Sequence, residues 1–312
     1  MSEDTIGAPN VGRYPPVKVW VKTARPVSLT ASITPLLVGA AVAFYAGTFH
    51  PLPFFEALLA GAFLQIGANY FNEYFDYRYG LDSHESLGAS TVIFRNEMTA
   101  KQVLGGGIAV FSAAAVLGIL LIIQVGYAIL LFGVAAMAIA YFYSAKPFKL
   151  AARGFGDIFV MVAMGFLMTW GSYYVQIPHW SWQVFAASIP VSFLVDAILN
   201  MNNLRDYDDD KKVHKMTIPV RFGRDSGKAF HMFLVFGSFA AVTLFVIFRV
   251  LPYPALIIWF ALPLAISHIQ TILPETDRRK LARGMPQISR LHLDFGVLLA
   301  VGVVFAALLR IH

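Results

Sequence analysis

Two groups of Asn and Asp residues repeat one spacing at distant points of the chain. Asn72 and Asp76 lie in "NEYFDYRYGLD", and Asn202 and Asp206 lie in "NNLRDYDDD", 130 residues later; each group follows a long apolar segment. Residues four apart share a helix face, so each pair forms a polar stripe, which Asp210 extends in the second group. Carboxylates this close repel one another unless cations intervene. Because the chain has no cysteine, its available ligands are mainly oxygens, which suit Mg²⁺.

Basic residues adjoin both acidic groups. They are Arg78 and Arg95 in the first, and Arg205, Lys211, Lys212, Lys215 and Arg221 in the second. Mg²⁺ together with Arg and Lys can hold a diphosphate and stabilise the charge on a leaving group. The residues therefore predict departure of a diphosphate at a membrane surface. An acidic loop at a membrane end can also be merely solvated, but the doubled spacing favours a site.

The elements that must position these residues are apolar. Of 312 residues, 58% are hydrophobic and 13% charged, with a mean hydropathy of +0.65, whereas a soluble domain carries about twice that charged fraction. We therefore expect an all-α, polytopic membrane protein, since a backbone in lipid must satisfy its own hydrogen bonds. The predicted spans are nine: 28–48, 53–75, 102–124, 126–144, 155–177, 183–204, 229–249, 253–273 and 292–310.

The distribution of Lys and Arg predicts the orientation. Residues 1–27 and the connections after the even-numbered spans hold 22 of the 24 basic residues. By the positive-inside rule, these parts are cytoplasmic and the C-terminus lies outside. We expect a cytoplasmic segment over 1–27, which does not resemble a signal peptide, and one transmembrane domain over 28–312. The net charge of +6 reflects this asymmetry, so no nucleic-acid partner is expected, and the sequence indicates no oligomeric state.

Several motifs together resemble the UbiA superfamily of intramembrane prenyltransferases over most of the chain. "NEYFDYRYGLD" is similar to N-D-x-x-D-x-x-x-G-x-D, the first motif of the menaquinone branch, whose members are 1,4-dihydroxy-2-naphthoate polyprenyltransferases. "NNLRDYDDDKKVHKMTIPVRFGR" resembles the second motif, N-N-x-R-D-x-x-x-D followed by G-K-R-T-L-x-V-R-x-G. Trp20 with "ARPVSLTASITPLLVG" resembles the entry helix of that branch, and "RGFGD" with "GSYYVQ" matches a further pattern of it.

The resemblance implies nine helices around a central cavity, with cytoplasmic cap segments, in a bacterial or archaeal cell membrane. It implies Mg²⁺-dependent transfer of a polyprenyl group from a prenyl diphosphate to an aromatic acceptor. In the naphthoate branch the acceptor loses CO₂ and the product is demethylmenaquinone. A different aromatic or lipid acceptor is the alternative within the family. A secondary transporter is the alternative from another class, although transporters place their polar residues nearer the midplane.

Site residues follow from the same resemblance. The implied ligands of two Mg²⁺ ions are Asp76, Asp82, Asp206 and Asp210. Asn72 and Asn202 are implied to contact metal or diphosphate at the mouth of the cavity. The basic residues expected to bind the diphosphate are Arg95, Arg153, Arg205 and Lys215. Residues expected near the acceptor or the allylic cation are Glu73, Tyr143, Tyr174 and Asp196.

Some positions depart from the family pattern or from membrane norms. Glu73 stands where the motif has Asp, His214 stands where Gly is usual, and Met216 replaces a basic residue. Asp196 lies ten residues before Asp206, roughly 15 Å deeper along a helix. A carboxylate at that depth is costly and predicts either a buried hydrogen-bonding role or substrate contact. Asp157 and Asp294 are expected nearer a membrane face.

Overall fold

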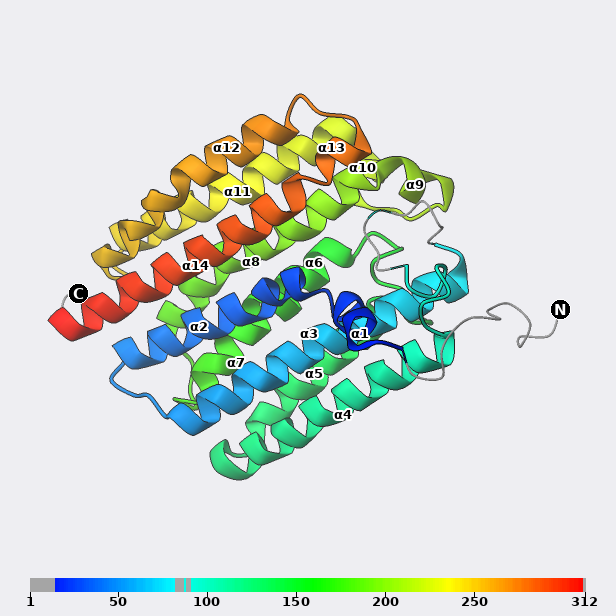
Figure 1. Cartoon of the computed structure of the whole chain (residues 1–312). Helices are drawn as coiled ribbons and strands as arrows, with labels where there is room; N and C mark the ends of the chain where they lie inside the picture. The colour runs from blue at the N-terminus through cyan, green and yellow to red at the C-terminus, as the bar shows by residue number, and fades with distance from the viewer. Residues whose placement is uncertain (1–14, 82–86, 88–90, 311–312) are drawn as a thin grey trace.

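The apolar segments form helices that run between two ends of one bundle (Figure 1). The computed structural model describes residues 15–81, 87 and 91–310, and this part of the chain contains helices and no strand. The elements are α1 Val17–Ala24, η1 Pro26–Leu29, α2 Thr30–Tyr45, α3 Pro51–Tyr79, α4 Ala100–Val125, α5 Ala128–Phe142, α6 Gly156–Val160, η2 Met161–Leu167, α7 Met168–Tyr174, α8 Trp182–Arg205, α9 Tyr207–Lys212, α10 Ile218–Phe222, α11 Arg224–Ile247, η3 Tyr253–Ala261, α12 Leu262–Ile272, α13 Arg278–Leu281 and α14 Gly284–Leu309.

Seven of the helical segments in the described residues are long and apolar enough to cross a membrane. The other two predicted spans correspond to α5, which is shorter, and to the continuous run α6–η2–α7. An all-helical membrane protein is thus confirmed, while nine crossings remain a prediction. The last span was predicted to start at 292, but α14 starts at Gly284. The polar residues of its first turns belong to the helix rather than to the preceding loop.

The first acidic motif lies inside α3 rather than beyond its end. The predicted span ended at 75, whereas α3 continues to Tyr79 and stops at Gly80, which has φ +66°. The N–H groups of Gly80 and Leu81 donate to the carbonyls of Tyr77 and Asp76 at 3.2 and 2.9 Å. This pattern closes a helix with a left-handed residue, a conformation that glycine adopts without strain. Gly80 therefore ends α3 one turn after Asp76.

Helix α8 occupies the centre of the bundle and is mostly buried. Its side chains join those of α2, α11, η3, α12 and α14 in the largest apolar cluster. Small residues let these helices approach closely. At Gly296 on α14, a Cβ would lie 1.9 Å from the Thr34 Cγ2 on α2, and at Gly302 a Cβ would lie 2.4 Å from the carbonyl oxygen of Pro254. These contacts fix α14 against its neighbours.

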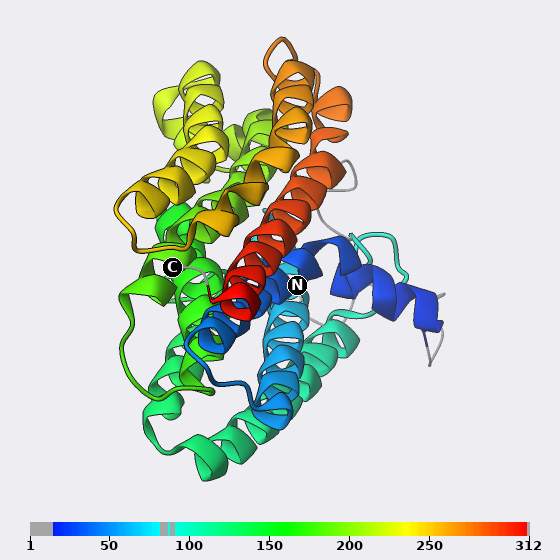
Figure 2. The same ribbon diagram turned by 90° about the vertical axis from the view of Figure 1, so that its left-hand side faces the viewer.

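Short helices gather at one end of the bundle. Figure 1 shows α1, α9, α10 and α13 at the end opposite to the last turns of α14, and Figure 2 shows α1 extending sideways from the bundle. A buried cluster attaches α1 and the segment after residue 90 to α3; its members are Val19, Tyr70, Val92, Ile93, Met98 and Val103. The connections that are rich in Lys and Arg lie at this same end of the bundle. This arrangement supports the predicted membrane orientation.

Candidate functional site

A cavity of about 610 Å³ opens at the end that carries the short helices, and both Asn-x-x-x-Asp motifs line it. Its acidic and amide lining includes Asn72, Asp76, Asn202, Asp206 and Asp210. Its basic lining comprises Arg25, Lys149, Arg205 and Lys215. Motifs that are 130 residues apart in the sequence therefore meet at one site, as the sequence predicted.

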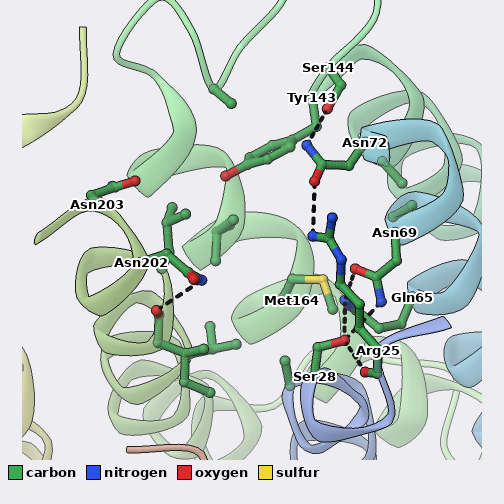
Figure 3. Close-up of a pocket in the computed structure, with 18 of the residues that line it drawn as sticks. Arg25, Ser28, Gln65, Asn69, Asn72, Tyr143, Ser144, Met164, Asn202 and Asn203 are labelled. Atoms are coloured by element: carbon green, nitrogen blue, oxygen red, sulfur yellow. Dashed lines mark hydrogen bonds between the residues drawn. The ribbon is translucent and has the colours of Figure 1, made fainter. Parts of the chain in front are cut away.

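Asn72 is the centre of the first half of the site (Figure 3). Its Nδ2 donates to Asp76 Oδ2 at 2.7 Å and to Ser144 Oγ at 3.1 Å, and its Oδ1 accepts a hydrogen bond from Arg25 Nη1 at 2.9 Å. The Asn72–Asp76 bond shows that the two residues share a face of α3. Arg25 can reach Asn72 because it has a left-handed φ of +53° and joins α1 to η1. Hydrogen bonds to residues from three different parts of the chain thus fix the orientation of the Asn72 amide group.

The second half of the site continues across the end of α8. Helix α8 ends at Arg205, and α9 begins at Tyr207, yet the N–H of Asp210 still donates to the Asp206 carbonyl at 2.8 Å. The Arg205 guanidinium donates twice to the Asp206 carboxylate, at 2.8 and 2.5 Å. Lys215 Nζ lies 3.2 Å from Asp210 Oδ1. Each carboxylate therefore has a basic partner that can turn toward a bound anion.

Burial and neighbouring charges shift the pKa values of two ionisable groups in this half of the site. Burial raises the pKa of the Asp210 carboxyl to about 6, with Asp206 acting in the same direction and Lys215 opposing. Burial also disfavours the charge on Lys215, but the attraction of Asp210, Asp76 and Asp206 outweighs it and raises the pKa of Lys215 above its ordinary value. Lys215 is therefore a fixed positive charge among three carboxylates.

The donor set fits a magnesium ion that is shared with a substrate. The buried Asp210 Oδ2 has no hydrogen-bond donor among the described residues, and a buried carboxylate oxygen without a partner is costly unless a cation binds it. Over residues 15–81 and 91–310, no three His, Asp or Glu side chains lie close enough to hold an ion by themselves. Mg²⁺ commonly uses one or two carboxylates and completes its shell with water and phosphate oxygens.

Below the charged mouth most of the cavity wall is apolar, although Ser28, Gln65 and Asn69 also line the cavity. The apolar part is formed by side chains of α3, α5, the α6–η2–α7 run and α8, including Leu64, Ile139, Phe159, Met164, Met168 and Leu199. Figure 3 shows Met164 between Asn202 and Gln65. A ligand that carries a charged head and an apolar body would match both parts.

Other predicted site residues lie elsewhere. Arg95 and Arg153 are exposed and do not line the cavity, although Ala151 and Ala152 beside Arg153 do. Tyr174 packs against Phe132, also outside the lining. Asp82 lies outside the described residues.

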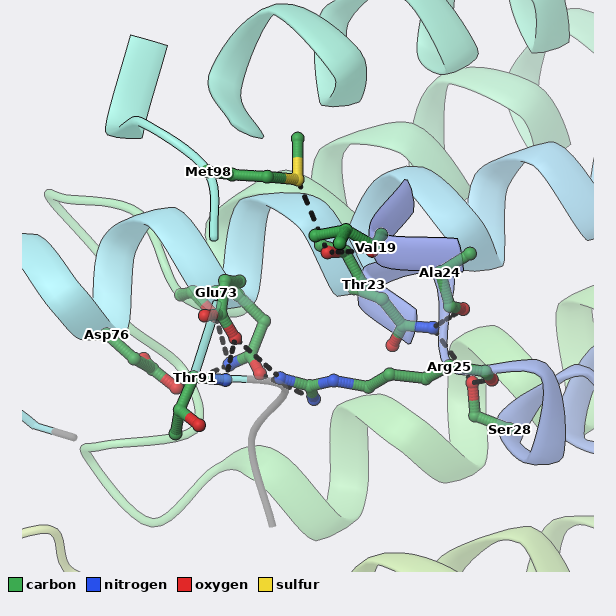
Figure 4. Close-up of polar contacts among 12 residues, drawn as sticks. Val19, Thr23, Ala24, Arg25, Ser28, Glu73, Asp76, Thr91 and Met98 are labelled. Carbon is green, nitrogen blue, oxygen red and sulfur yellow. Dashed lines mark hydrogen bonds and ion pairs between the residues drawn. The ribbon is translucent and has the colours of Figure 1, made fainter. Parts of the chain in front are cut away.

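Glu73 is buried behind the cavity rather than in its wall (Figure 4). Its Oε2 accepts a hydrogen bond from the N–H of Thr91 at 3.2 Å and lies 3.6 Å from Arg25 Nη2. The longer reach of Glu, compared with the Asp of the family motif, spans from α3 to the segment after residue 90. Glu73 thus positions Arg25 and this segment. The tentative assignment of Glu73 to the acceptor pocket has no support in this geometry.

Sequence reasoning did not single out Arg25, Ser144 or Lys149, which all line the cavity. Lys149 Nζ lies 3.5 Å above the centre of the Tyr79 ring, which holds the side chain beside the end of α3. Burial, together with Lys146 and Arg153, lowers the pKa of Lys149. Arg25 belongs to the stretch "ARPVSLTASITPLLVG", which was considered only for its resemblance to an entry helix. Lys149 belongs to a connection whose basic residues were interpreted only as an indication of membrane orientation.

Comparison with known proteins identifies the family of the chain. The sequence pattern of the UbiA prenyltransferase family matches residues 32–292. The 1,4-dihydroxy-2-naphthoate octaprenyltransferase of Bacillus subtilis is 29% identical and covers 92% of each chain. The enzyme of the same name from Haemophilus influenzae is also 29% identical, over 92% of this chain and 96% of its own.

Solved structures show the same fold. The apo structure of a UbiA homologue from Aeropyrum pernix K1 has a TM-score of 0.63 at 16% identity, covering 88% of this chain and 97% of its own. A UbiA homologue from Archaeoglobus fulgidus, bound to DMAPP and Mg²⁺, has a TM-score of 0.59 at 17% identity, covering 90% of this chain and 99% of its own.

Proposed function

The chain belongs to the UbiA prenyltransferase family and is an integral membrane prenyltransferase, and from this premise we propose that it transfers a polyprenyl group from a prenyl diphosphate to 1,4-dihydroxy-2-naphthoate. The acceptor loses CO₂, and the immediate product is the hydroquinone form of demethylmenaquinone. The observation that carries the proposal is the convergence of two Asn-x-x-x-Asp motifs and four basic side chains on the mouth of one largely apolar cavity. The relatives named for this reaction support the choice of acceptor.

Asp76, Asp206 and Asp210 are the described residues that would hold magnesium, and Asp82 would complete the set. Bound Mg²⁺ would neutralise the diphosphate and favour its departure with the electron pair of the C–O bond. Asn72 and Asn202 lie at the mouth, where their amide groups can donate to phosphate oxygens or accept from water on the metal.

Lys215, Arg205 and Lys149 would carry the remaining charge of the leaving diphosphate. Arg205 and Lys215 are already turned toward carboxylates in the site, at 2.5 to 3.2 Å. If a metal ion were held by those carboxylates, Arg205 and Lys215 would be free to bind phosphate oxygens. The apolar wall would hold the prenyl chain and keep water from the allylic cation.

We also infer that the end with the cavity faces the cytoplasm, and that residues 28–312 form one nine-helix domain preceded by a cytoplasmic segment. The concentration of Lys and Arg in the connections at that end supports this orientation. A diphosphate substrate made in the cytoplasm would then enter the site without crossing the membrane.

The test uses the full chain purified in detergent, with Mg²⁺, a polyprenyl diphosphate and 1,4-dihydroxy-2-naphthoate. We expect demethylmenaquinone by mass spectrometry, diphosphate release in equal amount, and loss of both when EDTA removes the metal. Product from 4-hydroxybenzoate but not from the naphthoate would refute the acceptor. The absence of transfer to any aromatic acceptor would refute the whole proposal.

A pair of neighbouring aspartates offers a matched control. Asp206→Asn should reduce turnover by at least about 10²-fold, a usual effect for a group that stabilises transition-state charge. Asp208→Asn should stay within about twofold of the wild type, because the Asp208 side chain is 66% exposed and does not line the cavity. Equal losses in both variants would mean that general disruption of α9, rather than metal binding, explains the effect.

A further inference from the structure

A second acidic pair lies behind the cavity wall, away from the metal-binding motifs. Asp196, in the middle of α8, has a side chain with 0% exposure, and Asp157 on α6 is 4% exposed. Asp157 was expected nearer a membrane face, and its side chain in the first turn of α6 is buried in the bundle. Their helices pack directly on each other, because a Cβ at Gly156 would lie 3.6 Å from Leu199 Cδ2 on α8, and the two carboxyl groups interact with each other.

This pair has few other partners. Among the described residues, no donor reaches either oxygen of Asp196 or the Oδ1 of Asp157. The positive charge of Lys215 acts on Asp157. The Tyr143 hydroxyl lies against Gly156, the residue before Asp157. Two adjacent carboxylates in an apolar bundle repel each other strongly, whereas one shared proton converts the repulsion into a hydrogen bond. We therefore expect the pair to hold one shared proton and to be able to accept a second.

The local fold holds the two acids together. The run that begins with α6 continues as a π-helix, η2, which is rare and often marks functional sites. One turn before Asp196, Ser192 Oγ donates to the carbonyl of Met161 at 3.2 Å. A Cβ at Gly165 would lie 2.0 Å from that same Ser192 Oγ, so the two helices touch through a position that only glycine fits. This contact sets the register of Asp157 against Asp196.

Tyr143 connects the pair to the cavity. Its side chain lines the cavity and extends along the wall (Figure 3). Its hydroxyl lies against Gly156, because a Cβ there would be 3.3 Å from the hydroxyl oxygen, and Gly156 directly precedes Asp157. Tyr143 therefore extends from the cavity wall to the residue beside Asp157.

We propose that Asp157 and Asp196 act together, through the Tyr143 hydroxyl, as the group that takes the ring-hydroxyl proton of the aromatic acceptor during prenyl transfer and later returns it. Tyr143 would be the catalytic residue in contact with the acceptor, and the two aspartates would be positioning and proton-holding residues behind it. The inference rests on the proposed function, since it requires a hydroxylated aromatic acceptor in this cavity.

Every proton and electron pair in the proposed step is accounted for. The C–O bond of the prenyl diphosphate breaks, and its electron pair leaves with the diphosphate. The acceptor hydroxyl gives its proton to Tyr143 while Tyr143 passes its own to the carboxyl pair, and the ring carbon next to that hydroxyl forms the new C–C bond. Loss of CO₂ from this carbon returns an electron pair to the ring, and the proton travels back to the oxygen. The product of this step is the hydroquinone form of demethylmenaquinone, so no external acid, base or oxidant is needed.

The experiment compares acceptors whose ring hydroxyls differ in acidity. Wild type, Asp157→Asn, Asp196→Asn and Tyr143→Phe are assayed in single turnover with the naphthoate and with analogues that carry electron-withdrawing substituents. We expect each variant to slow transfer to the least acidic acceptor by about 10²-fold or more, as for loss of a general base. The loss should shrink as the hydroxyl becomes more acidic, because an ionised acceptor needs no base.

Two controls separate this role from a structural one. Binding of a non-reactive prenyl thiodiphosphate with Mg²⁺ should be unchanged in all variants. Asp294→Asn should behave as the wild type, because Asp294 is a half-exposed carboxylate on α14 that pairs with Arg290 outside the cavity. The double variant of Asp157 and Asp196 should lose little more than either single variant, since the pair acts as one unit.

The result that would overturn the inference is a loss that is equal for all acceptors, or no loss at all. If the aspartate variants fail to fold, Tyr143→Phe decides alone, because it removes only a hydroxyl. Failure of the proposed function would look different: the wild type itself would transfer no prenyl group to any hydroxylated aromatic compound.

Discussion

Shortening Glu73 by one methylene should loosen the segment after residue 90. In Glu73→Asp the carboxylate moves back by about 1.5 Å, so the 3.2 Å contact with the N–H of Thr91 opens beyond hydrogen-bonding distance. A hydrogen bond to a charged group contributes about 1.5–3 kcal/mol. The local opening of residues 91–98 should become easier by that amount, which corresponds to roughly 10- to 100-fold faster amide exchange.

Hydrogen–deuterium exchange of peptides covering residues 91–98 measures this effect. Two variants serve as controls. Glu73→Gln keeps an acceptor oxygen at the same reach, so the Thr91 contact should persist and exchange should rise less than in Glu73→Asp. Glu97→Gln removes a partly exposed ion pair with Lys22, 2.7 Å long, and such pairs contribute about 1 kcal/mol or less. Unchanged exchange in Glu73→Asp would refute the structural role assigned to Glu73, even though that substitution restores the residue of the family motif.

Three further predictions follow from the site and the packing. Lys149→Met should raise the KM for the prenyl diphosphate about tenfold, whereas Lys146→Met, outside the cavity lining, should not; equal effects would contradict the assignment. Because the pKa of Asp210 is about 6, protons compete with Mg²⁺ below that pH, so the Mg²⁺ concentration for half-maximal activity should rise from pH 7.5 to 5.5; a constant value would exclude Asp210 as a ligand. Gly302→Ala should lower the midpoint of thermal unfolding, because its Cβ would lie 2.4 Å from the carbonyl oxygen of Pro254 and overpacking costs about 1–3 kcal/mol. Gly118→Ala should not lower the midpoint, because the space around its Cβ is open.

The sequence predicted the elements more reliably than the contacts between them. Apolar runs of twenty residues leave little choice but a helix, so most predicted spans agree with the structure to within a few residues. The exceptions are the ends with polar residues: α3, α11 and α14 all extend through residues that were predicted as loop. The pairing of Asn72 with Asp76 was predictable because a fixed spacing on one helix sets it.

Contacts between distant segments could not be predicted in this way. Asp157 and Asp196 lie 39 residues apart in the sequence, and nothing in either neighbourhood indicates that a π-helical stretch and Gly165 bring α6 onto α8. Arg25 likewise reaches Asn72 only because its left-handed backbone turns the chain between α1 and η1. Tertiary packing decides such contacts, and a pattern read along one chain does not contain it.

The distribution of charge in the cavity suggests why the two acidic systems are separate. The carboxylates at the mouth have basic partners: Arg205 for Asp206, and Lys215 for Asp210. They can remain ionised and exchange these partners for metal. The carboxyl groups of Asp157 and Asp196 interact mainly with each other, so this pair is best suited to hold a proton. A metal-dependent leaving-group site at the mouth and a proton-holding pair beside the apolar wall would act on opposite ends of the same reaction, with Tyr143 lying between them. This arrangement requires that substitutions at the mouth impair diphosphate departure for every acceptor, whereas substitutions in the deep pair impair transfer according to acceptor acidity.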